Sequence, residues 1–520
     1  MSGDRYQDNL GYYCREAGLK YPDKPAIIDL FGGQERVVAY SDLNSRMDRV
    51  AAALTARGLK PGDRMILCVG NRVEFVEVMF GAMRAGIVPV PINTRLGPDV
   101  LGYITENSGA VGAVVEPASN DFISAIADEA GLGVRIAIDG AAGDWEDYEA
   151  AMASAEPTFE PPALEEDHLS FLPYTSGSTG RPKGVPLTHA GQLWWIRAYA
   201  RHWPPSPDAR NLVAVPLYHK NAMAGAVKPR LYTGGSFVLM PSFEPRAFLE
   251  AVAKYRCTNI GGVPTVFTML LQEKDLLESL DFSALEAAVV GSAPVHEELE
   301  KQMAEAFGVT VGQSYGLTEG GPVMIGPPTD GRPVPNGSCG VAWPEGEVKL
   351  VDSEGNEHES YGELWVRNPG VSPGYYNLPE VNAERYKDGY LRTGDLFSRD
   401  SDGFFYFRGR TDDMFNCGGE NVYPKEVENL LLTHPDVVDA CVVPVEHATK
   451  GEAPVALVVL RDGIDVGEDD LKRFCLDNGP AFAHPRRVLM TDELPLTGAA
   501  KVDRSGIAKR MAEELGVIGG

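Results

Sequence analysis

The segment from Tyr174 to Gly184 has the composition of a loop that could hold phosphate groups. It combines four small hydroxyl residues, three glycines and two cations, in the order Tyr-Thr-Ser-Gly-Ser-Thr-Gly-Arg-Pro-Lys-Gly. Glycines let backbone N–H groups approach a ligand closely, and hydroxyls and a lysine add donors for phosphate oxygens. The spacing is not that of a Walker A loop. A flexible Ser/Gly linker is the weaker alternative, because Arg181, Pro182 and Lys183 lie inside the segment.

A second segment matches the nucleophile elbow of serine hydrolases. Gly312 to Gly316 fits G-x-S-x-G, with Ser314 in the nucleophile position. That elbow needs a strand before it and a helix after it. The residues from Leu317 to Pro322 include two glycines and a proline, so they cannot readily begin a helix. We therefore expect this match to be accidental. The nine histidines form no metal-binding pattern either, since His296 is not followed by the second histidine of H-E-x-x-H.

The elements that must position these segments alternate between helix and strand in the first part of the chain. A helix capped by Ser41 is expected to end before Gly58. Short apolar runs typical of strands recur at 65–69, 88–92, 212–216, 236–240, 259–263 and 287–291. Strands and helices that alternate at this spacing predict an α/β fold, with parallel sheets covered by helices.

The pattern changes after about Ser338, where short strand-like runs are separated by Gly, Pro and Asn turns. This predicts a β-rich subdomain. The charged stretch from Arg410 to Asp413 indicates a boundary, and the remaining length suits a small α+β domain. We expect a large domain of residues 1–411 and a small domain of residues 412–520.

The overall charge excludes some classes of partner. The chain of 520 residues has 47 Lys and Arg against 74 Asp and Glu, a net charge of −27. Such a chain repels nucleic acid and anionic lipid surfaces, so neither is an expected partner. No apolar run is long enough to span a bilayer, and no signal peptide is evident at the N-terminus. The seven scattered cysteines indicate free thiols, so we expect a cytoplasmic protein; no oligomeric state is predicted.

Several segments together resemble the ordered motifs of the adenylate-forming enzymes, which include acyl-CoA synthetases, adenylation domains of peptide synthetases and luciferases. The first is the Tyr174–Gly184 loop, similar to the family's phosphate-binding signature. The others follow in the family's order: 313–319 (Gln-Ser-Tyr-Gly-Leu-Thr-Glu), 390–395 (Tyr-Leu-Arg-Thr-Gly-Asp), 407–413 (Phe-Arg-Gly-Arg-Thr-Asp-Asp), 418–424 (Gly-Gly-Glu-Asn-Val-Tyr-Pro) and 495–503 (Pro-Leu-Thr-Gly-Ala-Ala-Lys-Val-Asp). Several ordered matches are more specific than any one alone.

The resemblance implies a site for ATP and Mg²⁺. Glu319, next to Thr318, would hold Mg²⁺, a hard cation that prefers oxygen ligands. Asp395 would accept hydrogen bonds from the ribose hydroxyls, and Arg410 would contact ribose and phosphate. The resemblance implies further nucleotide contacts at Thr175, Ser176, Gly177, Ser178, Thr179, Gly180, Lys183, Gly291, Ser292, Ala293, Tyr315 and Gly316. On local grounds alone, each of these residues has a plainer alternative. Glu319 could be an exposed acid in a turn, and Asp395 could belong to an ordinary Gly-Asp turn. Arg410 could be a solvated surface arginine.

The resemblance also implies a catalytic lysine and a moving domain. Lys501 would reduce the repulsion between a carboxylate and the α-phosphate. Without the surrounding P-x-T-x-x-x-K pattern, a solvated surface lysine would be the expected reading. Asp412 resembles the hinge about which the small domain turns. One orientation would place the lysine for adenylation. The other would bring the loop of Gly418 and Gly419 to the adenylate, where coenzyme A reacts.

His219 is the expected acid-pocket residue. The run from Pro216 to His219 resembles the acyl-pocket segment of acyl- and aryl-CoA ligases, and the small residues Ala222, Ala224 and Gly225 follow it. A histidine satisfied by its neighbours is an equal alternative.

These matches imply an AMP-forming acyl-CoA synthetase that uses ATP, Mg²⁺ and coenzyme A to activate a small carboxylic acid, with an aryl or medium-chain acid favoured. One alternative is an adenylation enzyme for an amino acid or another acid that loads a different thiol. Peptide-synthetase domains usually have an Asp in the segment that matches His219, and this chain has none there. A serine hydrolase and a non-catalytic nucleotide-binding protein are the weaker alternatives.

Overall fold

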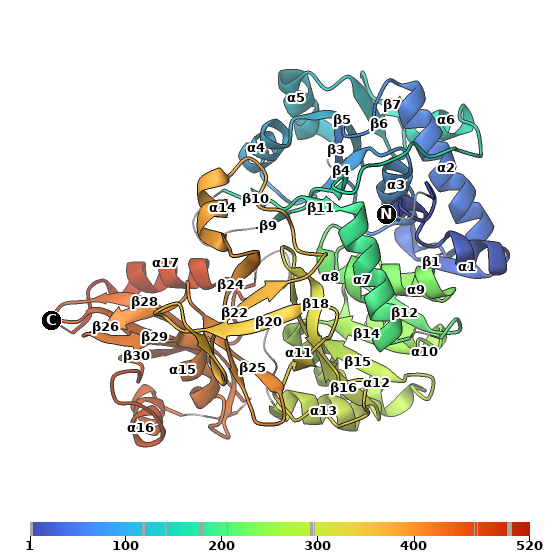
Figure 1. Ribbon diagram of the computed structural model, residues 1–520. Helices are drawn as coiled ribbons and strands as arrows, with labels where there is room; N and C mark the ends of the chain where they lie inside the picture. Colours follow the sequence, from blue (N-terminus) through green and yellow to red (C-terminus); the bar gives the residue numbers. More distant parts are fainter. Residues whose placement is uncertain are drawn as a thin grey trace.

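Two sheets, one mostly parallel and one entirely parallel, form the first part of the molecule (Figure 1). The computed structural model describes residues 4–116, 120–140, 143–175, 181–204, 206–291, 295, 297–461, 463–464, 466–496 and 502–519. The first sheet has seven strands in the order β16 (Thr310–Gln313), β15 (Ala287–Val290), β14 (Asn259–Gly262), β12 (Arg210–Val213), β13 (Ser236–Leu239), β1 (Pro25–Asp29) and β2 (Arg36–Ala39). Only its edge strand β2 is antiparallel. The second sheet is parallel, in the order β4 (Val88–Pro91), β3 (Arg64–Cys68), β5 (Ala110–Val115), β6 (Val134–Ala137) and β7 (Glu146–Asp147).

Helices cover these sheets, and strands such as β13 and β4 are buried along their whole length. This is the burial expected for parallel strands with both faces covered. The bounds of the main helices are α2 (Tyr40–Ala56), α3 (Val73–Arg84), α4 (Pro98–Ser108), α5 (Asn120–Ala130), α6 (Tyr148–Ala153), α7 (His189–His202), α9 (Lys228–Thr233), α10 (Pro245–Lys254), α11 (Pro264–Gln272), α12 (Lys274–Ser279) and α13 (Glu297–Phe307).

Helix α2 begins one residue before the predicted cap. Its N-cap is Ala39, which has no side chain to accept a hydrogen bond, so the prediction of a Ser41 cap is wrong. The backbone N–H groups of Tyr40 and Ser41 instead donate to the carbonyl oxygens of Lys24 (3.1 Å) and Pro22 (2.9 Å). Tertiary contacts therefore replace the side-chain cap at this helix start.

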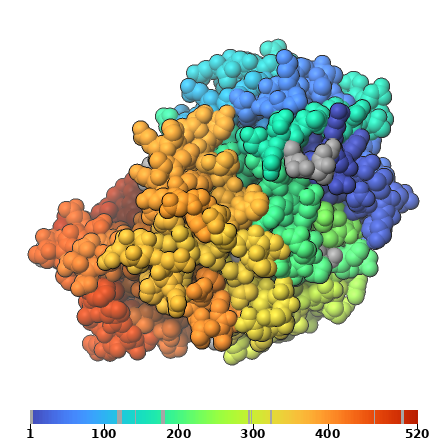
Figure 2. Space-filling model, in the orientation of Figure 1, coloured from blue at the N-terminus to red at the C-terminus, as the bar shows by residue number. Residues whose placement is uncertain are grey.

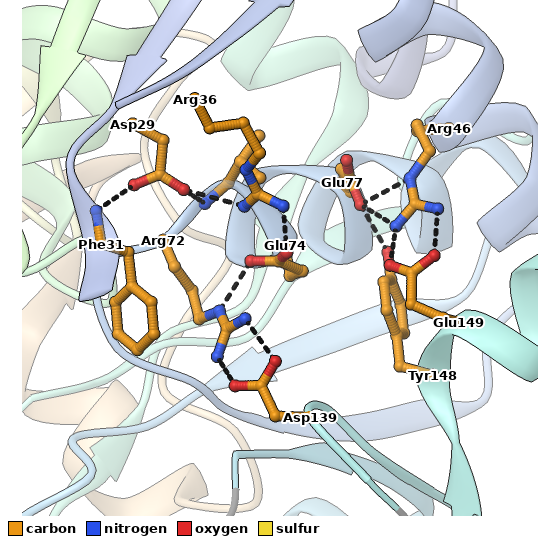
Figure 3. A network of polar contacts seen from close by, with 11 residues as sticks. Asp29, Phe31, Arg36, Arg46, Arg72, Glu74, Glu77, Asp139, Tyr148 and Glu149 are labelled. Atoms are coloured by element: carbon orange, nitrogen blue, oxygen red, sulfur yellow. Dashed lines mark hydrogen bonds and ion pairs between the residues drawn. The ribbon is translucent and has the colours of Figure 1, made fainter. Parts of the chain in front are cut away.

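Helix α3, buried at every residue, carries an ionic network that links the two sheets (Figure 3). Arg36 of β2 bonds both Asp29 of β1 and Glu74 of α3, at 2.8 Å each. Arg72 joins Glu74 (2.6 Å) to Asp139, which follows β6 of the second sheet. Burial alone would raise the pKa of Glu74, but the two guanidinium groups lower it to about 2. A buried carboxylate paired in this way stays charged and fixes the two sheets relative to each other.

A β-rich unit follows the seven-stranded sheet. Its sheet has the order β17 (Tyr315–Leu317), β18 (Gly321–Gly326), β19 (Gly340–Ala342), β25 (Phe404–Arg410), β24 (Tyr390–Arg399), β22 (Tyr361–Arg367), β20 (Glu347–Val351) and β21 (Glu357–His358), and β23 (Tyr386–Lys387) pairs with β24. Helix α14 (Pro379–Arg385) precedes β23. Ser314 lies between β16 and β17, and a β-hairpin follows it where an elbow would require a helix. The hydrolase match is accidental, as predicted.

The last part of the chain has a mixed sheet and a hydrophobic core of its own. Its strands are β27 (Glu420–Val422), β26 (Phe415–Cys417), β29 (Gly451–Leu460) and β28 (Val437–His447), with β30 (Arg487–Met490) parallel to β29. Its helices are α15 (Pro424–Leu431), α16 (Glu468–Asn478) and α17 (Arg504–Leu515). Figure 2 shows this red part packed against the yellow and orange β-rich unit. The predicted fold class is confirmed.

All seven cysteines are free, as the sequence indicated, and the structure buries each of them. Across the described ranges, no helix is both long enough and apolar enough to cross a membrane.

Candidate active site

One continuous cleft of about 2150 Å³ lies where the carboxyl ends of the parallel strands face the β-rich unit and the last part of the chain. It is lined by many of the residues that the sequence singled out: Thr175, Lys183, His219, Gly291, Tyr315, Gly316, Thr318, Glu319, Asp395, Arg410 and Asp412. Other predicted site residues lie outside the described residues: Ser176, Gly177, Ser178, Thr179, Gly180, Ser292, Ala293 and Lys501. The carboxyl edge of a parallel sheet is where ligands of open α/β folds bind.

The two ends of the predicted phosphate loop lie side by side. Strand β9 (Tyr174–Thr175) pairs with β10 (Lys183–Gly184), and Thr175 is directly opposite Lys183. A second short pair, β8 (Leu169–Phe171) with β11 (Leu187–Thr188), lies just outside the first. This ladder brings a hydroxyl and an ammonium group to the cleft together.

The carboxylate of Glu319 faces this loop. Its Oε1 accepts hydrogen bonds from Thr175 Oγ1 (3.3 Å) and from the hydroxyl of Tyr375 (3.0 Å). Its backbone carbonyl accepts from the N–H of Ser372 (2.6 Å). Two distant segments therefore fix Glu319 beside the Thr175–Lys183 ladder. Tyr375 was not predicted, because nothing in its local sequence distinguishes it from a loop tyrosine.

Lys220 is a further residue of the site that the sequence analysis missed. Its side chain is buried in the cleft wall next to His219, and its Nζ donates to the carbonyl oxygens of Leu317 (3.2 Å) and Thr318 (2.5 Å). Burial lowers the pKa of Lys220 to about 7, while the carboxylate of Glu319 acts in the opposite direction. The available signal was a lysine two residues before a run of small and apolar residues, Ala222 to Val227.

Asp395 is buried under Tyr315 and Arg410. Its Oδ2 accepts from the hydroxyl of Tyr315 (2.5 Å), and its Oδ1 lies 3.6 Å from a guanidinium nitrogen of Arg410, its partner across β24 and β25. Burial raises the pKa of Asp395, and Arg410 and Tyr315 act against that rise. Gly394 has a φ of +75°, and a Cβ there would meet a nitrogen of Arg385 at 2.7 Å. The Thr-Gly-Asp turn therefore needs its glycine to aim Asp395 at the cleft.

His219 caps the short helix that follows it, α8 (Lys220–Ala222), and its Nδ1 accepts from the N–H of Asn221 (3.3 Å). It lines the cleft and also accepts this local hydrogen bond, so its role at the acid pocket stays a prediction. Gly291 ends β15, and its N–H donates to the carbonyl oxygen of Gly262 (3.1 Å). Asp412 accepts from Arg385 (3.2 Å) and Arg410 (3.4 Å), so two arginines hold the predicted hinge residue in this orientation.

The last part of the chain presents one face to the cleft. Val502, Asp503, Arg504 and Ser505, which directly follow Lys501, line it. Gly418 and Gly419 form the turn between β26 and β27 and are not among the lining residues that the structure describes. The segment that follows Lys501 is therefore at the cleft in this structure, and the Gly418–Gly419 turn is away from it.

Comparison with known proteins gives the family. The model of the AMP-binding enzyme family matches residues 14–376. The chain belongs to the AMP-binding enzyme family. The model of the AMP-binding enzyme C-terminal domain also matches, over residues 426–501.

The relatives agree with this assignment. A feruloyl-CoA synthase from Amycolatopsis sp is 34% identical over 91% of this chain and 94% of its own length. A 4-coumarate–CoA ligase from Pinus taeda is 30% identical over 97% of this chain and 95% of its own. The crystal structure of ATP-bound MatB from Rhodopseudomonas palustris superposes with a TM-score of 0.89 at 30% identity, covering 98% of this chain and 99% of MatB. The prediction of an AMP-forming acyl-CoA synthetase is confirmed at the level of this family and these relatives.

The donors of the cleft suit Mg²⁺ held largely by its substrate. In the part of the chain that the structure describes, no group of three or more His, Cys, Asp or Glu could bind a metal alone. Glu319 supplies one carboxylate and Thr318 one hydroxyl at the cleft. Mg²⁺ is usually bound by one or two carboxylates together with substrate phosphates. The residues therefore fit a metal that enters with ATP.

We expect Lys220→Met to lower the rate of acyl-adenylate formation roughly 10- to 100-fold, the effect of losing hydrogen bonds from a charged group. The change leaves the carbonyls of Leu317 and Thr318 without their buried donor and removes a cation beside Glu319. Pyrophosphate release measures the effect. Lys220→Arg should restore part of the rate, and Lys274→Met, an exposed lysine at the same cleft, is the control. A normal rate in Lys220→Met would show that the lysine does not position the Glu319 loop.

Proposed function

We propose that this chain is an AMP-forming CoA ligase that activates an aryl-substituted carboxylic acid through an acyl-adenylate. The observation that carries the proposal is the shared cleft. One side has Thr175, Lys183, Glu319, Asp395 and Arg410, which suit a magnesium nucleotide, and the other is an apolar pocket below His219.

The first step forms the adenylate. An oxygen of the acid's carboxylate attacks the α-phosphorus of ATP, the bond between the α- and β-phosphates breaks, and pyrophosphate leaves. Lys183 and the 174–184 loop hold phosphate oxygens, and Asp395 accepts from the ribose hydroxyls with Arg410 beside it. Glu319 would hold Mg²⁺, which would supply positive charge for the leaving pyrophosphate. Lys501 screens the two anions as they meet.

The second step forms the thioester. The thiol sulfur of coenzyme A attacks the carbonyl carbon of the adenylate, the bond from that carbon to the phosphate oxygen breaks, AMP leaves, and the thiol proton is released. In the orientation described above, the segment after Lys501 faces the cleft and Gly418 and Gly419 do not. This supports an arrangement suited to adenylation. Before the second step, residues 412–520 would turn about Asp412 relative to residues 1–411.

The acid pocket supports an aryl substrate more than a medium-chain one. Tyr199, Trp203 and Tyr218 line its walls, and Gly261 leaves room at the sheet surface. Flat walls around a glycine floor suit a ring. The names of the relatives from Amycolatopsis sp and Pinus taeda point to ferulate and coumarate, which are aryl acids. We also propose a cytoplasmic location, where ATP and coenzyme A are available.

The test is pyrophosphate release with a panel of aryl, short, medium and long acids. Release should require both ATP and an acid, and a CoA thioester should form when coenzyme A is added. The best aryl acid should exceed the best straight-chain acid in kcat/KM. Adenylate formation without transfer to coenzyme A would favour an enzyme that loads another thiol. ATP-independent hydrolysis lost in Ser314→Ala would favour a hydrolase, and nucleotide binding without release would favour a binding protein.

A further inference from the structure

The deep end of the acid pocket is polar, although its walls are apolar. On the seven-stranded sheet, Gly261 is paired with Val289, and two residues earlier Asn259 is paired with Asn211. Side chains two residues apart share a face of a strand, and each pair of residues deepens the pocket by about 7 Å. The pocket therefore passes from a glycine and valine layer to a layer of two asparagines, all four of which line the cleft.

Arg230 closes this end. It comes from helix α9, lies 5% exposed, lines the cleft, and its Nε donates to Oδ1 of Asn211. Tyr199 of α7 lies beside it and interacts with the guanidinium group. Burial lowers the pKa of Arg230, and Tyr199 and the exposed Glu286 act against this shift. Among the described residues, no carboxylate lies within ion-pair distance of Arg230.

A buried guanidinium without an acidic partner is costly. Charges removed from water are normally paired or hydrogen-bonded to several groups. Arginine has five donors in a rigid fork. Asn211 accepts from the Nε of Arg230, and Tyr199 also interacts with the guanidinium group. The other buried cation on α9, Lys228, bonds Gln192 (2.7 Å) and does not line the cleft. Arg230 is thus the one of the two that can meet a ligand.

The acid's orientation places its far end near Arg230. The reacting carboxyl group must lie at the carboxyl edge of the sheet, near His219 and Glu319, because the nucleotide groups are there. Asn211 lies two residues behind Val213, the last residue of β12. An acid with a ring in the Gly261 and Val289 layer would therefore reach the asparagine and arginine layer with its distal substituent.

We propose that Arg230, supported by Asn211 and Tyr199, binds an oxygen acceptor at the end of the acid opposite its reacting carboxyl group. The enzyme then selects acids with a distal hydroxyl or carboxyl group over acids of equal size with an apolar end. The proposal rests on the proposed function, since it concerns the same acid pocket. A site built to hydrogen-bond a substrate group rejects analogues that lack it, because its own buried polar groups are left unpaired.

The experiment compares three 3-phenylpropenoic acids, with a para-hydroxyl, para-carboxyl or para-methyl group, in pyrophosphate release and thioester formation. In the natural enzyme, at least one oxygen-bearing acid should exceed the methyl acid in kcat/KM by roughly 10- to 100-fold. Preference for the carboxyl acid would identify an anionic group, and preference for the hydroxyl acid a neutral one. Equal turnover of all three overturns the proposal without affecting the proposed function.

The variants test Arg230 itself. In Arg230→Met the ratio of oxygen-bearing to methyl acid should fall to near one, and Arg230→Lys should retain part of it. Arg246→Met, an exposed arginine of α10, should keep the natural ratio. An unchanged ratio in Arg230→Met overturns the proposal, and if that variant fails to fold, Arg230→Lys and the three acids on the natural enzyme decide it. Turnover of no acid in this series or in the wider panel would instead refute the proposed function.

Discussion

Replacing Lys501 with alanine should lower ATP- and acid-dependent pyrophosphate release by about two to three orders of magnitude, the usual effect of removing a positioned charge from a transition state. Attack of a carboxylate on the α-phosphate brings two anions together, and a cation between them lowers that repulsion. Leu496 and Val502 form an antiparallel bridge, and Asp503 N–H donates to the carbonyl of Pro495 (2.8 Å). The described residues on either side of Lys501, Leu496 and Val502, are therefore paired with each other, and Val502 lines the cleft.

The two half-reactions separate catalysis from folding in this variant. Lys501→Ala, supplied with synthetic acyl-adenylate and coenzyme A, should form thioester at nearly the natural rate, because we expect the lysine to act only in the first step. Lys509→Ala, an exposed lysine of α17, should be normal in both steps. Normal pyrophosphate release by Lys501→Ala would show that the lysine assignment is wrong. Equal loss of both half-reactions would indicate a structural role.

The features that local sequence could predict are those with a repeating or ordered pattern. The apolar runs at 65–69, 88–92 and 236–240 fall within one or two residues of β3, β4 and β13, since a buried parallel strand is apolar along its whole length. The motif that ends in Asp395 was recognisable by its resemblance to one of the family's ordered motifs, and the structure gives its Gly394 a φ of +75°. By contrast, the cap of α2 depends on the carbonyls of Pro22 and Lys24, which no pattern around Ser41 reveals.

Lys220 and Arg230 show what the sequence could not predict. A lysine or arginine is most often solvated, and only its tertiary partners make it part of a site. Those partners are Leu317 and Thr318 for Lys220, 97 and 98 residues away. For Arg230 of helix α9 the partner is Asn211 of strand β12. The net charge of −27 is likewise a property of the whole chain and says nothing about the charges within one site. It argues against long anionic polymers, whereas ATP requires only the local cations of one cleft.

Glu319→Gln should lower pyrophosphate release about 100-fold at low magnesium concentration and recover part of the rate as magnesium is raised. The substitution keeps the shape of the side chain, and its amide oxygen can still accept from Thr175 and Tyr375. What it removes is the negative charge that a hard cation requires. The loss should therefore appear as a higher magnesium requirement, measured by titrating magnesium at saturating ATP and acid.

The comparison with two further variants separates charge from geometry. Tyr375→Phe removes one of the two hydrogen bonds to Glu319 and leaves its charge, so its magnesium requirement should change far less. Glu298→Gln removes a carboxylate of α13 that also lines the cleft, and it should not change the requirement at all. A natural magnesium dependence in Glu319→Gln would exclude Glu319 as the metal ligand.

Because Glu319 also raises the pKa of the buried Lys220, its replacement should make that amine still easier to deprotonate. The two residues should therefore act as one unit, and the double variant Glu319→Gln with Lys220→Met should lose less than the product of the two single losses.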